Sequence, residues 1–96
     1  MFARKVLVVD DEETIRETVC DFLNLKGYDA RGAAQGKQAL KLMEGFVPNV
    51  VFLDYMMPLF SGLELFPRMK RIFPYLKVII VTGRGSEEIA VRALKM

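Results

Sequence analysis

The sequence predicts an α/β fold in which a parallel β-sheet carries helices on both faces. Short apolar runs alternate with segments of helical spacing along all 96 residues, and this alternation favours parallel strands joined by right-handed crossovers. Three of the four runs are apolar throughout, which is typical of strands buried on both faces. Domains range from about 50 to 250 residues, so we expect residues 1–96 to form one domain.

Four strands are expected where β-branched and apolar residues gather, at residues 6–9, 28–31, 50–53 and 78–81. The second of these runs alternates between polar and apolar residues, as an edge strand does. The other three are uninterrupted, so we expect them to be buried on both faces.

The first helix is expected between the first two strands. Its apolar stripe consists of Ile15, Val19, Phe22 and Leu23. Gly27 follows the stripe and is expected to cap the carboxyl end of this helix.

Three further helices are marked by their stripes and boundary residues. The second has its stripe within residues 39–43 and ends near Gly45, and the third has its stripe within residues 65–73 and contains Pro67. Ser86 is expected to be the N-cap of the fourth.

The composition limits the classes of protein to consider. Fourteen basic and twelve acidic residues give a formal charge of +2, too little for a nucleic-acid-binding surface. The single cysteine, Cys20, excludes an intramolecular disulfide, and no apolar run approaches the roughly 18 residues of a membrane span. We therefore expect a cytoplasmic protein without direct contacts to nucleic acid or membrane.

Acidic side chains follow two of the expected strands. Asp10 and Asp11 come after the first, Asp54 comes after the third, and Thr82 follows the fourth. Parallel sheets bind ligands at the carboxyl ends of their strands, and neighbouring carboxylates repel each other unless a cation lies among them. Hard oxygen ligands in a chain without histidine favour Mg²⁺ over zinc.

Each acidic residue also has a structural interpretation. Asp10 and Asp11 could cap a helix that begins near Glu12, and Asp54 could form a turn before Pro58. Taken singly, these interpretations stay open. Convergence of all the acidic residues with Thr82 by chance is much less expected.

The motifs together resemble one family. LVVDDE at residues 7–12 is similar to the opening of a receiver domain, and VFLDYMMP at residues 51–58 is similar to its phosphorylation-site segment. LFSGLE at residues 59–64 and IVTG at residues 80–83 also fit, in the same order. The chain thus resembles, over its whole length, the receiver domains of two-component response regulators of the chemotaxis type.

This resemblance implies a flavodoxin-like, doubly wound sheet with strand order 2-1-3-4. The family's fifth strand, the lysine at its end and the fifth helix have no counterpart in the sequence, so we expect a C-terminally truncated receiver domain. The strand at residues 78–81 would then be an exposed apolar edge through which copies could associate. Lys37, Lys41, Lys70 and Lys77 are expected to be solvated surface charges.

The resemblance also implies a role for each site residue. Asp54 would accept a phosphoryl group from a sensor histidine kinase. Asp11 and Asp54 would ligate Mg²⁺ directly, Met56 through its backbone carbonyl, and Asp10 through a bound water. Thr82 would donate its hydroxyl to a phosphoryl oxygen and so bias the following loop and helix. We therefore expect a signalling module and no enzyme.

Three other classes of protein share parts of this pattern. A flavin or nucleotide binder of flavodoxin-like fold needs a Gly/Ser/Thr-rich loop after the first strand, where this chain is acidic. Hydrolases with an aspartyl-phosphate intermediate carry a different pattern, Asp-x-Asp, after the first strand, whereas residues 10–12 of this chain are Asp-Asp-Glu. A receiver-like protein-interaction module that is not phosphorylated stays open.

Overall fold

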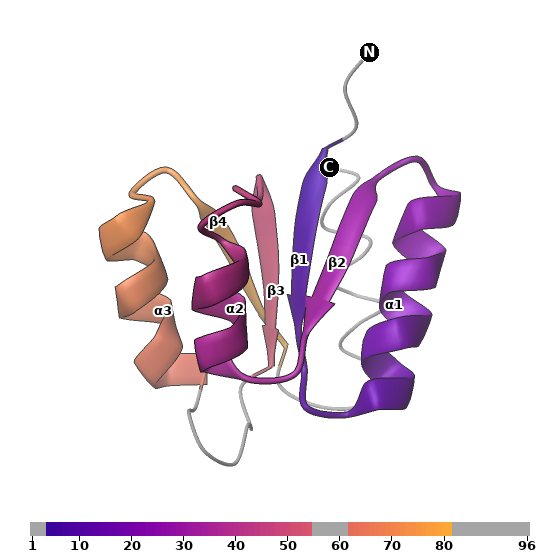
Figure 1. Ribbon diagram of the computed structural model, residues 1–96, viewed down its shortest axis with the longest axis horizontal. Coiled ribbons are helices and arrows are strands. Elements are labelled where there is room, and N and C mark those ends of the chain that lie inside the picture. Colours follow the sequence, from indigo (N-terminus) through magenta and orange to yellow (C-terminus); the bar gives the residue numbers. More distant parts are fainter. Residues whose placement is uncertain (1–3, 55–61, 82–96) are drawn as a thin grey trace.

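The computed structural model describes residues 4–54 and 62–81. Its elements are β1 (Lys5–Val9), α1 (Glu13–Leu25), β2 (Asp29–Ala33), α2 (Gly36–Leu42), β3 (Val50–Asp54), α3 (Gly62–Ile72) and β4 (Lys77–Val81). The four strands are parallel, in the order β2-β1-β3-β4 (Figure 1). This confirms the predicted α/β fold and strand order, whereas the helix expected from Ser86 lies outside the described residues.

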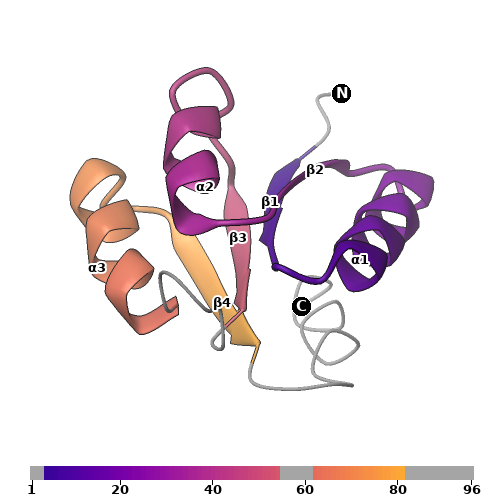
Figure 2. The same cartoon turned by 60° about the horizontal axis from the view of Figure 1, so that its bottom comes forward.

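Helices cover both faces of the sheet, with α1 on one face and α2 and α3 on the other (Figure 2). The side chains of β1 and β3 alternate between these faces. Val8 and Phe52 pack in the cluster beneath α1, whereas Val9 and Leu53 pack in the cluster beneath α2 and α3. The prediction that both strands are buried on two faces is therefore confirmed.

The fourth strand differs from the two central ones. Val78, Ile79 and Ile80 are only partly buried, because β4 pairs with β3 on one side and stands last in the sheet formed by the described residues. The prediction of full burial was wrong for this strand. Among the strands that the structure describes, its predicted position at the edge of the sheet is confirmed.

The buried stripe of α1 is narrower than its sequence suggested. Val19 and Leu23 are buried, but Phe22 keeps 39% of its surface exposed. A helix turns about 100° per residue, so Phe22 lies about 100° from Leu23 around the axis. The Phe22 ring instead lies 5.5 Å from the ammonium group of Lys26.

Gly27 ends α1 as predicted. Its φ of 95° is the left-handed conformation that favours glycine. The N–H of Gly27 donates to the carbonyl of Asn24, and the N–H of Tyr28 donates to that of Leu23. These two bonds satisfy the last carbonyls of the helix and turn the chain into β2.

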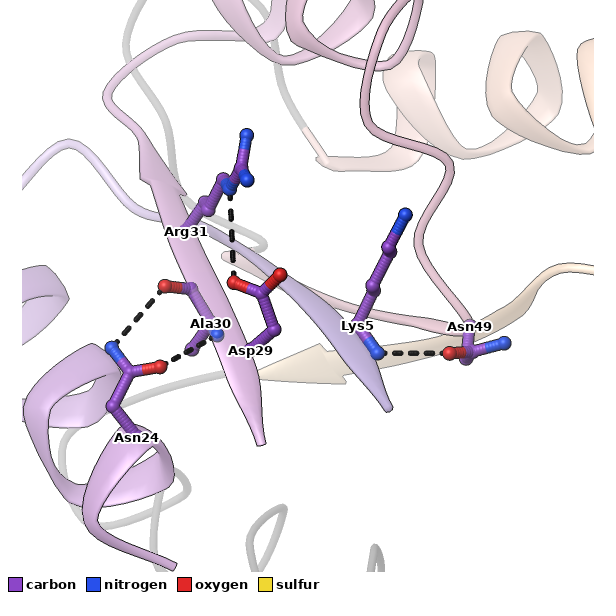
Figure 3. A network of polar contacts seen from close by, with 6 residues as sticks. All are labelled: Lys5, Asn24, Asp29, Ala30, Arg31 and Asn49. Carbon is purple, nitrogen blue, oxygen red and sulfur yellow. Dashed lines mark hydrogen bonds and ion pairs between the residues drawn. The ribbon is translucent and has the colours of Figure 1, made fainter. Parts of the chain in front are cut away.

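Two asparagine side chains form hydrogen bonds with the backbone at the end of the sheet where the strands begin (Figure 3). The Asn24 carboxamide accepts the N–H of Ala30 at 2.8 Å and donates to its carbonyl at 3.3 Å. The Asn49 side chain accepts the N–H of Lys5 at 2.8 Å. Asn24 therefore occupies backbone groups of the edge strand β2, while Asn49 joins β1 to the segment before β3.

The third helix packs through Leu65 and Met69, which are fully buried. Ile72 was predicted to belong to this stripe, but it is the last helical residue and is 54% exposed. The helix contains Pro67, as the sequence indicated. None of the helices that the structure describes is both long and apolar enough to cross a membrane.

One of the four lysines expected to be solvated is not. The ammonium group of Lys70 donates to the carbonyl of Leu76 at 2.7 Å in a partly buried contact. Because Leu76 leads into β4, Lys70 joins the end of α3 to the start of the last strand. No pattern in the sequence indicated this contact, since it depends on how the chain turns after the helix.

Candidate functional site

The carboxyl ends of β1 and β3 bring the acidic residues together. Val9, the last residue of β1, pairs with Leu53, and Asp54 ends β3 one residue later. Asp10 follows β1 directly, so it emerges at the same edge of the sheet. All four strands of Figure 1 point toward this edge, which is where parallel sheets bind ligands.

Asp10, Asp11 and Asp54 form a cluster there. Each offers one carboxylate oxygen, and these oxygens all lie within 4.8 Å of one another. Asp10 is buried, Asp54 is partly buried and Asp11 is exposed. The sequence predicted that these three residues meet, and the structure brings them together.

Three hydrogen bonds hold Asp10 in place. Its N–H donates to the carbonyl of Ala33 at 3.1 Å, and its carbonyl accepts a hydrogen bond from Nη1 of Arg16 at 2.9 Å. Its Oδ1 atom accepts the N–H of Glu12 at 2.9 Å. The contact from Arg16 was not foreseen, because a lone arginine in a helix carries no signal of its partner.

The capping interpretation of Asp10 and Asp11 does not describe α1. The N-cap residue is Glu12, and its side chain makes no capping hydrogen bond. The bond to Asp10 Oδ1 comes from the N–H of Glu12 itself, before the first helical turn. Asp10 therefore orders the connection between β1 and α1 while its carboxylate stays at the cluster.

Burial raises the pKa of Asp10 to about 6. The hydrogen bond from the N–H of Glu12 acts in the opposite direction, and the charges of Asp54 and Asp11 raise the pKa further. A carboxyl in this position loses its proton reluctantly, because it is buried and because its neighbours are also carboxylates. A bound cation would remove that penalty.

The oxygens of the cluster fit Mg²⁺. Two ligands of one octahedral Mg²⁺ lie at most about 4.2 Å apart, twice the Mg–O distance. The three carboxylate oxygens lie within 4.8 Å of one another, so a small side-chain movement or a bridging water would bring them onto one ion. Mg²⁺ prefers carboxylates and retained waters, and the exposure of Asp11 leaves room for water. Met56 and Thr82, the other predicted site residues, lie outside the described residues.

Comparison with known proteins identifies the family. Residues 6–96 match the family model described as the response regulator receiver domain. The sporulation initiation phosphotransferase F of Bacillus subtilis is 39% identical over 86 residues, which cover 90% of this chain and 69% of that protein. The chain therefore belongs to the response regulator receiver domain family, whose members are signalling modules.

Longer relatives and a solved structure agree with this. The phosphate regulon transcriptional regulatory protein PhoB of Pseudomonas aeruginosa is 33% identical over 98 residues, which cover 100% of this chain and 43% of that protein. A crystal structure of a response regulator receiver domain protein from Clostridium thermocellum superposes with a TM-score of 0.79 at 34% identity, covering 96% of this chain and 75% of that one. The chain thus spans less than half of the length of several curated relatives that it matches.

Proposed function

We propose that this receiver domain accepts a phosphoryl group on Asp54 from a sensor histidine kinase, in the cytoplasm, with Mg²⁺ held by the acidic cluster. The observation that carries the proposal is the convergence of Asp10, Asp11 and Asp54 at the carboxyl ends of β1 and β3. Membership of the receiver family supports it. The domain acts as a switch and not as an enzyme that releases product.

The chemistry requires one bond to form and one to break. A carboxylate oxygen of Asp54 attacks the phosphorus atom, and the bond from phosphorus to the donor breaks, so the donor leaves with the electron pair. Asp54 is partly buried, which leaves a side open for the donor. When bound, Mg²⁺ would neutralise the charge of the phosphoryl oxygens.

The remaining ligands follow from the family resemblance. Asp11 and Asp54 would hold the ion directly, Asp10 would act through a water, and Met56 would contribute its backbone carbonyl. The buried position of Asp10 and its raised pKa suit a carboxylate whose negative charge is needed only when a cation is present.

Thr82 is proposed as the residue that responds to the phosphoryl group. Asp54 pairs with Val81 in the register of β3 and β4, and Thr82 is the next residue of the chain. Its hydroxyl would donate to a phosphoryl oxygen and shift the population of the following loop and helix.

The test is intact-mass analysis after incubation with a small acyl phosphate and MgCl₂. We expect a gain of one phosphoryl group that disappears in Asp54→Ala, on addition of EDTA, and on treatment with hydroxylamine, which cleaves acyl phosphates. Asp21→Ala, which removes an exposed carboxylate from α1, is the matched control and should be modified like the wild type. If no Asp54-dependent adduct forms, the interaction module without phosphorylation becomes the better description.

A further inference from the structure

The guanidinium group of Arg16 reaches back from α1 to the connection that carries the acidic cluster. Its Nη1 atom donates to the backbone carbonyl of Asp10 at 2.9 Å. This carbonyl belongs to the peptide group that joins Asp10 to Asp11. Because a peptide group is planar, a hydrogen bond that fixes this carbonyl also fixes the direction in which the chain enters Asp11.

The path of the Arg16 side chain depends on Gly32 in the neighbouring strand β2. A Cβ atom built on Gly32 would lie 2.8 Å from Cγ and 2.9 Å from Cδ of Arg16, closer than carbon atoms in contact approach. Within the described residues, Gly27 is the only glycine with positive φ, so the backbone of Gly32 does not itself require glycine. Its missing side chain makes room for Arg16.

Strand β2 therefore supports both backbone polar groups of Asp10. Ala33 accepts the N–H of Asp10, and Gly32, one residue earlier, lets Arg16 reach the carbonyl. Asp11 is exposed, so little packing would otherwise restrict it.

We infer that Arg16 is a positioning residue for the metal site, acting through the Asp10 carbonyl and dependent on the space at Gly32. The inference rests on the proposed function, since it assigns Arg16 to the Mg²⁺ site described above. Partners that orient metal ligands typically change metal affinity by about 10- to 100-fold when they are removed. Arg16 orients a ligand through its backbone, so we expect an effect at the lower end, about tenfold.

The first experiment is an NMR titration of the protein with MgCl₂ alone, following backbone amides. Arg16→Met keeps the aliphatic stem but removes the donor. We expect its Mg²⁺ dissociation constant to rise about tenfold, and the Asp11 amide resonance to move before any Mg²⁺ is added. Arg31→Met is the control, because it also removes a cation, from the residue next to Gly32. In the wild type the Arg31 guanidinium packs 4.4 Å from the centroid of the Phe46 ring, away from the site.

The second experiment tests the dependence on Gly32 by a double-mutant cycle. Gly32→Ala should weaken Mg²⁺ binding in the wild type, because the new methyl group displaces Arg16. In an Arg16→Ala background the same change should have little further effect, since the obstructed side chain is gone. Additive effects of the two substitutions on Mg²⁺ affinity would overturn the inference.

The outcomes separate this inference from the proposed function. If the wild type binds Mg²⁺ and Arg16→Met binds it equally well, Arg16 has no positioning role while the proposed function stands. If the wild type shows neither Mg²⁺ binding nor an Asp54 adduct, the proposed function itself fails. Thermal unfolding of each variant shows that affinities are compared between folded proteins.

Discussion

Polar groups at the two ends of the sheet have opposite effects on the stability of the fold. Where the strands begin, Asn24 and Asn49 pair with backbone groups, and Arg31 lies 3.7 Å from Asp29 (Figure 3). Where the strands end, carboxylates crowd together and the pKa of Asp10 is raised. Polar groups at the first end stabilise the fold, whereas those at the second oppose it until a cation binds, as functional sites often do.

The largest expected effect is on Mg²⁺ affinity. Asp10→Asn keeps an oxygen that can accept the N–H of Glu12, but it removes a negative charge from the cluster. We expect Mg²⁺ affinity to fall by about 10- to 100-fold, measured by the same NMR titration. The substitution should also stabilise the metal-free protein at neutral pH, because it removes a buried charge and its repulsion with Asp54 and Asp11.

Asp21→Asn is the control for this comparison, because Asp21 is an exposed acid of α1. It should change neither the affinity nor the stability appreciably. If Asp10→Asn destabilises the metal-free protein, then the charge of Asp10 does not oppose folding.

The next effect is on the pH dependence of stability without Mg²⁺. The pKa of Asp10 is raised from 3.8 to about 6 in the folded protein, so between these pH values the folded state holds a proton that the unfolded state has lost. The contribution of Asp10 to the free energy of unfolding is therefore greatest below pH 3.8 and falls as pH rises to about 6. One pKa unit is worth about 1.4 kcal/mol, so the loss is on the order of 2 to 3 kcal/mol.

The free energy of unfolding of the wild type and of Asp10→Asn is measured in urea at a series of pH values. The difference between the two proteins separates the contribution of Asp10 from that of the other acids. With saturating Mg²⁺ the trend should reverse, since the ion binds the deprotonated carboxylates. An identical pH profile for the two proteins would rule out a raised pKa.

A smaller effect is expected at the opposite end of the sheet. Asn24→Ala leaves the N–H and carbonyl of Ala30 without their side-chain partner, so the free energy of unfolding should fall by about 1 to 2 kcal/mol. Mg²⁺ affinity should stay unchanged. A loss of affinity in this variant would show that the two ends are coupled.

The smallest effect is expected for the exposed pair of Arg31 and Asp29. Asp29→Asn breaks an ion pair whose side chains are 52% and 40% exposed, and such pairs contribute about 0.2 to 1 kcal/mol. The loss should shrink further in high salt. Urea unfolding at two salt concentrations measures both.

Much of this architecture could be predicted from local patterns. Continuous apolar runs located β1 and β3, and the acids that follow them predicted the cluster, because parallel strands end at one edge. Gly27 was predicted as the helix end because its chemistry suits that conformation. These features depend on neighbours in the sequence or on a general rule of topology.

The features that could not be predicted depend on tertiary packing. Arg16, Asn24 and Lys70 each hydrogen-bond a backbone carbonyl six residues away, and only the packed fold decides which carbonyl is in reach. The helical spacing of apolar residues also overestimated how much of the surface of α1 and α3 is buried. Phe22 and Ile72 were therefore assigned to the core although they are exposed.

The Asn24 contact bears on how this sheet could pair with another chain. Asn24 occupies backbone groups of Ala30 on the β2 edge, where another strand would otherwise add. Unpaired backbone groups of an edge strand are the template on which strands of other chains add and proteins aggregate. The asparagine would therefore also protect this edge of the sheet against aggregation.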